Sequence, residues 1–233
     1  MRNTLPKIGN FLRRLRSDTS GLAMIEFAYS LPFFFGVGGY GLEMANLATV
    51  NMKITQTANA LGDNMSRVGL TSILTSTQIR EADVVDSFNG VERQTQGLNL
   101  LSRGRIVLSS LQQNTSGGQW IAWQRCIGAK SVVSSYGTQG TGATGTSFAG
   151  MGPASARIAA PPGSAVMFVE ITYDYVPLFT TVFVPARTIR YEASFIVRDQ
   201  RELAGPIAPA DPDGIFNPAP AAPVRSCSTF SAT

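Results

Sequence analysis

The chain has 233 residues, enough for one hydrophobic core of ordinary size and additional segments. Residues 1–21 hold five basic residues and one acid, which equals the whole net charge of +4 and leaves the remainder neutral, so the charge does not indicate nucleic-acid binding. The absence of histidine excludes histidine-based catalysis and the common zinc sites, and we expect no enzyme activity, no cofactor and no metal.

An apolar stretch near the N-terminus predicts a transmembrane helix. The 21 residues from Leu22 to Leu42 contain one charged residue, Glu26, and only Ser30 and Pro32 are otherwise neither apolar nor glycine. A helix of this length spans about 30 Å, the thickness of a bilayer core. The basic leader, 1–21, predicts that the N-terminus stays in the cytoplasm and that the bulk of the chain lies across the membrane.

Glu26 is unusual because a charged residue inside a membrane helix costs about 2.5–3.5 kcal/mol on insertion scales. In one interpretation its side chain extends back to the interface and stabilises the N-terminus of the helix. In the other it has a functional partner. Composition alone leaves both interpretations open.

The basic leader, Gly21, and Glu26 as the fifth residue of the apolar helix together resemble the type IV prepilin motif. More narrowly, the segment 25–32 (IEFAYSLP) is similar to the TadE-like branch (TadE, TadF and TadG relatives) of Flp/Tad pilus proteins. The resemblance implies cleavage between Gly21 and Leu22 by a prepilin peptidase. It also implies that Glu26 and its neighbour Phe27 are recognised during processing or assembly. Phe27 departs from the many Flp/Tad members that carry tyrosine there.

The resemblance implies a minor pilin-like protein, or pseudopilin, that is needed to assemble a Flp/Tad-type pilus. Such a protein is anchored in the bacterial inner membrane, has its folded domain in the periplasm, and can enter the extracellular filament. Its implied partners are the prepilin peptidase, other pilus subunits and inner-membrane platform proteins. The alternative is an uncleaved, membrane-anchored periplasmic scaffold or binding protein of a secretion or cell-envelope system.

Residues 43–68 predict an amphipathic continuation of the helix, which Gly69 is expected to end. Asn51 is expected to occupy the one polar position of the stripe. The apolar positions follow spacings of three and four: Met44, Leu47, Ile54, Ala58, Leu61, Met65 and Val68. Pro32 removes one backbone hydrogen bond and is expected to kink or locally melt the membrane half of the helix.

Residues 69–233 predict an α+β domain. Thr75 and Gln78 have the spacing of a capping box and predict a short helix from Ser76 to Phe88. Apolar and alternating runs predict four strands, at 105–111, 120–127, 167–175 and 189–197. We expect the last two to pair antiparallel, each with one buried face, so that Glu170 and Asp174 face water.

The remaining segments are loops. We expect the Gly/Thr-rich residues 137–152 to be flexible and exposed, and the Pro/Ala-rich residues 205–224 to be extended and mobile. The apolar connection 176–185 either folds onto the core or stays exposed as a contact for a membrane or a partner. Cys126 and Cys227 are expected to form a disulfide, because the predicted location is oxidising.

Overall fold

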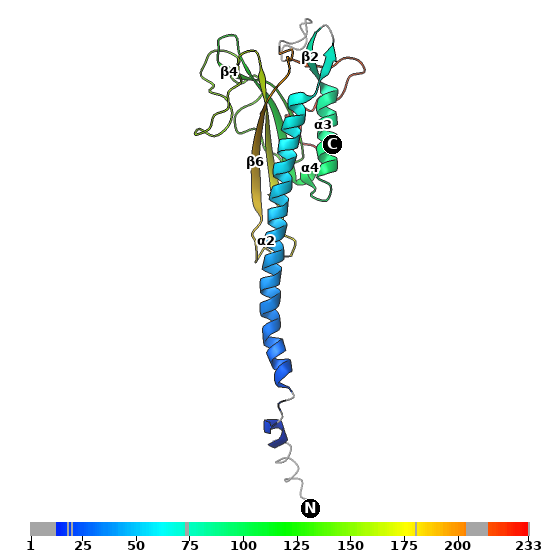
Figure 1. Cartoon of the computed structure of the whole chain (residues 1–233), viewed down its shortest axis with the longest axis vertical. Helices are drawn as coiled ribbons and strands as arrows, with labels where there is room; N and C mark the ends of the chain where they lie inside the picture. The colour runs from blue at the N-terminus through cyan, green and yellow to red at the C-terminus, as the bar shows by residue number, and fades with distance from the viewer. Residues whose placement is uncertain are drawn as a thin grey trace, which may run out of the picture. The chain divides into compact units, whose positions relative to one another are not determined.

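The computed structural model describes residues 13–17, 19, 21–72, 75–179, 181–203 and 214–232. The chain divides into two compact units. The first unit contains the chain up to Asn46 together with Pro177–Pro185, and the second contains Leu47–Val176 and Ala186–Thr233. Helix α2 (Leu22–Arg67) contributes residues to both units (Figure 1).

Helix α2 is one continuous helix of 46 residues, and it ends one residue before the predicted end. Gly69 follows with a φ of +153°. A Cβ atom at this position would lie 2.5 Å from Thr77 Cγ2, so both the backbone angle and the space require glycine. The helix also passes through Pro32 without interruption, so the expected local melting is not observed. Pro32 removes a single backbone hydrogen bond from a long helix, and the turns before and after it keep their backbone hydrogen bonds.

The buried stripe of α2 in the second unit differs from the prediction at Asn51 and at Val68, which is half-buried and lies one residue beyond the helix. Asn51 is exposed and donates a hydrogen bond to the carbonyl of Leu47 at 2.8 Å. Val50, only 6 % exposed, takes its place, because position 50 is also one turn from the next buried residue, Ile54. Met44, predicted to lie on the stripe, is exposed in the first unit. The buried stripe is therefore Leu47, Val50, Ile54, Ala58, Leu61 and Met65.

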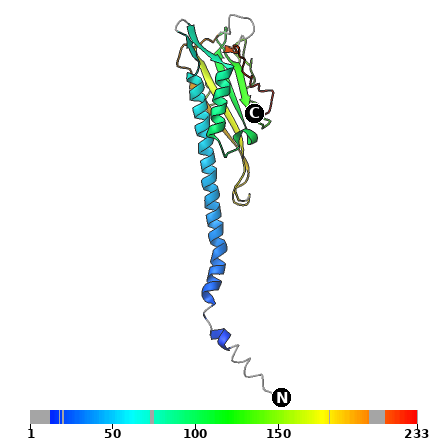
Figure 2. The same ribbon diagram turned by 90° about the vertical axis from the view of Figure 1, so that its right-hand side faces the viewer.

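The second unit is built on a four-stranded antiparallel sheet, whose strands are coloured from green to gold in Figure 2. The strand order is β4-β3-β5-β6. Each strand begins and ends within two residues of its predicted bounds. The strands are β3 (Gly104–Gln113), β4 (Gln119–Ile127), β5 (Ala165–Tyr175) and β6 (Arg187–Ile196). The antiparallel pairing of β5 with β6 is confirmed, with Glu170 opposite Glu192.

Helices cover one face of this sheet. A Cβ atom at Gly62 of α2 would lie 2.6 Å from the ring of Phe195 and 3.5 Å from Val169, so the helix approaches β5 and β6 closely. Helix α3 (Glu81–Gln94) lies on the same face. Arg125 of β4 is in register with Leu108 of β3 and, through it, with Val169 of β5, so the three side chains share one face of the sheet. On that face Arg125 donates a hydrogen bond to Glu81 of α3 at 2.8 Å. A short helix, α4 (Leu100–Arg103), precedes β3 and was not predicted.

Irregular segments cover the other face. Phe168 of β5 packs there with Met151 from the long β4–β5 connection. As a result β3, β4 and β5 are buried along almost their whole length. The prediction that β5 has one buried face is therefore wrong. It holds for β6 from Ile189 onward, where buried or half-buried odd positions alternate with exposed even positions.

The predicted start of the helix after α2 is also wrong. Residues Thr75–Arg80 form β2, which pairs with β1 (Leu70–Ser72) and, in parallel, with β7 (Ile215–Phe216). Helix α3 starts after β2, where the backbone N–H of Arg80 donates to the carboxylate of Asp83 at 2.9 Å. The start of α3 is therefore capped by the Asp83 carboxylate on the backbone of Arg80, because the backbone around Thr75 is engaged in strand pairing.

Both low-complexity segments are held more tightly than their composition suggests. The Gly/Thr loop is mostly exposed, but the N–H of Ile121 donates to the carbonyl of Thr141 at 2.9 Å and Met151 is fully buried. Within the Pro/Ala-rich tail, 205–213 lie outside the described residues. In the described part, Ile215 and Phe216 form β7, and the Asn217 side chain exchanges two hydrogen bonds with the backbone of Ala222, so this part is not a free extension.

Candidate functional site

The first unit exposes a long apolar helix surface. Helix α2 is long and apolar enough to cross a membrane, and none of its most apolar window is buried within the structure. An exposed apolar surface of this kind is typical of a contact with lipid or with a partner. More than half exposed are Leu22, Met24, Ile25, Phe27, Tyr29, Phe33, Phe34, Phe35, Val37 and Leu42.

The predicted processing and assembly residues lie at the start of this surface. The carbonyl of Gly21 accepts the first hydrogen bond of α2 from the N–H of Ile25 at 3.1 Å, so the bond between Gly21 and Leu22 is at the helix boundary. Among the residues that the structure describes, and apart from its chain neighbours, no atom lies within 4 Å of a Cβ placed at Gly21. Glu26 and Phe27 are exposed, and Glu26 follows Leu22 by four residues on the same helix face. Their roles stay predictions.

Glu43, which ends the apolar stretch, was not identified as a site residue from the sequence. Its side chain is fully buried, at 0 % exposure. The carboxylate accepts hydrogen bonds from the backbone N–H of Leu178 at 3.0 and 3.1 Å and from that of Phe179 at 3.2 Å. These bonds offset the cost of removing a carboxylate from water. The local signal was a lone acid directly after the apolar run.

The loop bound by Glu43, Pro177–Pro185, belongs to the same unit as the first half of α2. The ring of Phe183 would lie 3.0 Å from a Cβ at Gly39, so this glycine allows the loop to approach the helix. An open apolar groove of about 590 Å³ lies between them, and Pro32, Phe35 and Phe179 are among its lining residues. The sequence left two alternatives open for this loop. The structure combines them, since some side chains are buried and others are exposed.

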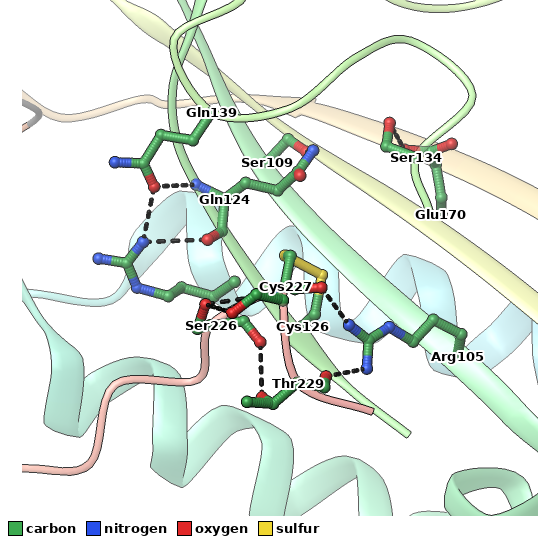
Figure 3. Close-up of a disulfide and its surroundings, with 12 residues drawn as sticks. Arg105, Ser109, Gln124, Cys126, Ser134, Gln139, Glu170, Ser226, Cys227 and Thr229 are labelled. Atoms are coloured by element: carbon green, nitrogen blue, oxygen red, sulfur yellow. Dashed lines mark hydrogen bonds between the residues drawn. A yellow bond between two sulfur atoms is a disulfide. The ribbon is translucent and has the colours of Figure 1, made fainter. Parts of the chain in front are cut away.

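The second predicted feature, the disulfide, lies in the second unit. Cys126 of β4 and Cys227 of the C-terminal segment are bonded, with their Cα atoms 4.8 Å apart (Figure 3). The N–H of Cys126 donates to the carbonyl of Arg225 at 2.8 Å, and that of Gly128 donates to Ser231 at 2.7 Å. The C-terminal segment is therefore fixed alongside the end of β4.

Arg105 supports the same segment and was also missed. Its buried guanidinium donates to the carbonyls of Cys227 and Thr229 at 2.9 and 2.7 Å (Figure 3). It also donates to the carbonyl of Gly128 at 2.8 Å. It also lies over the ring of Phe230, 4.5 Å from the centroid. Burial lowers the pKa of Arg105. The cation is held by backbone oxygens and an aromatic ring, so its role here is to anchor the chain.

A polar concavity of about 410 Å³ lies beside the disulfide. Among its lining residues, Arg125 donates to both carboxylate oxygens of Glu81 and to Gln139 Oε1. The two opposite charges that line the concavity, Arg125 and Glu81, are therefore paired with each other. In the part of the chain that the structure describes, no three His, Cys, Asp or Glu side chains are grouped as metal ligands would be.

Glu170 was expected to face water and is instead only 7 % exposed. Its carboxylate accepts hydrogen bonds from the hydroxyl of Ser134 and from the backbone N–H of Ser135, the latter at 2.9 Å. Burial raises the pKa of Glu170, and these two hydrogen bonds oppose the rise. The β4–β5 connection covers Glu170, and nothing in the alternation of β5 indicated that cover.

Comparison with known proteins finds no family model that matches the chain, no similar curated protein and no similar solved structure.

Proposed function

We propose that the chain is a membrane-anchored, pilin-like subunit of the TadE-like kind that takes part in assembling a Flp/Tad-type pilus. The observation that carries the proposal is the division of α2. Its first half is apolar and exposed, and its second half forms part of the core of a folded domain. A subunit of this design can exchange lipid contacts for helix–helix contacts, because both surroundings are apolar.

The start of α2 supports the processing step. Because α2 begins at Leu22, cleavage after Gly21 would remove the basic leader and leave the helix complete. The new amine would lie one turn before Glu26 on the same helix face. A carboxylate in an apolar helix needs a partner, and the amine of Leu22 in a neighbouring subunit would supply a positive charge.

The disulfide supports location of the second unit in an oxidising compartment. Disulfides persist outside the cytoplasm and are rare inside it. The bond between Cys126 and Cys227 therefore fits a periplasmic domain, on the opposite side of the membrane from the basic leader.

The first test is the intact mass of the protein extracted from its native membrane. The proposal predicts a mass that lacks residues 1–21. A Gly21→Leu variant should keep the leader and lose pilus assembly. Gly36→Leu is the matched control and should be cleaved normally, because in the described part of the chain no atom beyond the local helix backbone lies within 4 Å of a Cβ at Gly36. A full-length mass for the unaltered protein would favour the uncleaved periplasmic scaffold.

A second variant separates processing from assembly. Glu26→Gln keeps the size of the side chain and removes its charge. If the carboxylate binds the amine of Leu22 in another subunit, this variant should still be cleaved but should assemble poorly. Normal assembly of Glu26→Gln would contradict the proposed role of the charge.

A further inference from the structure

The loop Pro177–Pro185 has the composition of a lipid contact. It contains no charged residue, and the first charges on either side are Asp174 and Arg187. Leu178 is 66 % exposed and Val182 is 85 % exposed, and Phe179 is similarly open. Neighbouring large apolar side chains that remain exposed in a folded unit indicate a surface made for an apolar environment.

The backbone of the loop is prepared for the same environment. A peptide N–H that leaves water must be hydrogen-bonded within the protein, or it costs several kcal/mol. Glu43 satisfies two such groups, the N–H of Leu178 and that of Phe179. One buried carboxylate therefore binds the backbone of the loop, while the side chains of Leu178 and Phe179 remain exposed.

The position of the contact along α2 gives the depth of the loop. Phe183 lies against Gly39, three residues before Leu42, the last residue of the apolar stretch. At 1.5 Å per residue, Gly39 is about 5 Å inside the end of that stretch. The apolar groove extends farther along the helix, to Pro32. The loop therefore lies beside the apolar part of α2, at the end away from the N-terminus.

We propose that Pro177–Pro185 is a second membrane contact, which places Leu178, Phe179 and Val182 in the phospholipid leaflet opposite the N-terminus. The inference rests on the proposed membrane anchoring of α2. The occupant is lipid because the loop surface is continuous with the exposed face of the helix in the same unit. Glu43 sets the depth of the loop by fixing its backbone to the helix.

Spin labels attached to the oxidised full-length protein in phosphatidylcholine–phosphatidylglycerol vesicles test this proposal. The native cysteines are bonded to each other, so an added cysteine is labelled selectively. Val182→Cys reports on the loop, Phe34→Cys on the exposed helix, and Thr144→Cys on a water-exposed loop. Oxygen concentrates in lipid and a nickel chelate stays in water, so their collision rates give the surroundings of each label.

The proposal expects the label at position 182 to resemble the label at 34, with frequent oxygen collisions and a loss of most chelate collisions. A label at 182 that resembles the one at 144 overturns it, and a label at 182 shielded from both reagents indicates a protein partner instead and also overturns it. If position 34 is in water as well, the membrane anchoring of α2 fails too, so the two failures are distinguishable.

A Glu43→Ala substitution tests the cause. It should return chelate collisions to the label at position 182 and leave the label at 34 unchanged. Glu92→Ala, which removes an exposed acid from α3, is the matched control and should change neither. An unchanged label at 182 in Glu43→Ala would overturn the role of Glu43.

Discussion

The guanidinium of Arg201 donates a hydrogen bond from Nη1 to the carbonyl oxygen of Met65 at 3.1 Å. Nη2 donates to the carbonyl of Val68 at 2.9 Å, so one side chain 136 residues after Met65 caps the last turn of α2. The last four carbonyls of a helix have no donors within it. Burial lowers the pKa of Arg201 to about 10, which leaves it charged at neutral pH.

Arg201→Met should therefore destabilise the protein by about 1–3 kcal/mol, because it leaves buried carbonyls without a donor. The free energy of unfolding in urea, followed by tryptophan fluorescence of the detergent-solubilised full chain, measures the loss. Arg198→Met removes an exposed arginine of the same region and should stay within about 0.5 kcal/mol of the unaltered protein. Equal stability of the two variants would refute the capping role.

Two glycines inside helices should respond in opposite directions to alanine. At Gly90 in α3, no atom of another described segment lies within 4 Å of a Cβ, so Gly90→Ala should stabilise by about 0.5–1 kcal/mol through helix propensity. A Cβ at Gly62 would lie 2.6 Å from Phe195, so Gly62→Ala should lose that gain and destabilise by about 1 kcal/mol or more. Stabilisation by both, in the same urea measurement, would show that Phe195 moves aside easily.

Elements with a strong internal period could be predicted from the sequence, and elements defined by distant partners could not. The 46-residue helix and the four main strands follow from apolar spacing. The start of α3 could not be predicted in this way, because Thr75 and Gln78 also have the spacing of a capping box. Residues 75–80 form a strand because they pair with the neighbouring β1 and, at Ile79 and Arg80, with β7, which lies more than 130 residues later in the chain.

The candidate site residues also divide into those that a local pattern could predict and those that depend on distant partners. Gly21 and Glu26 form a local motif, so their spacing alone was informative. The partners of Glu43 lie 135 residues away in a loop, and a lone acid gives no signal of where its hydrogen bonds go. The burial of Glu170 depends on a connection without periodicity, which no pattern of β5 could reveal.

The disulfide should contribute to stability mainly by restricting the unfolded chain. Cys126 and Cys227 are 101 residues apart, and a loop of about 100 residues corresponds to at most about 4.7 kcal/mol in the chain-entropy model. Because Arg105 also holds the C-terminal segment, we expect the Cys126→Ser, Cys227→Ser double variant to fold and to lose about 2–4 kcal/mol. Reductant should destabilise the unaltered protein and leave the double variant unchanged. A response of the double variant to reductant would rule out this explanation.

Glu170 should make stability depend on pH in the direction opposite to a salt-bridged carboxylate. Its pKa is raised in the folded state, chiefly by burial, so the folded protein binds this proton more tightly than the unfolded chain does. The resulting stability is present below the unfolded value of about 4.3 and is lost as pH rises through the folded pKa. As pH rises through that window, the Tm of the unaltered protein should therefore fall relative to the Tm of the Glu170→Gln variant. Glu92→Gln controls for the loss of one exposed charge. A relative gain with rising pH would mean that the hydrogen bonds from Ser134 and Ser135 outweigh burial.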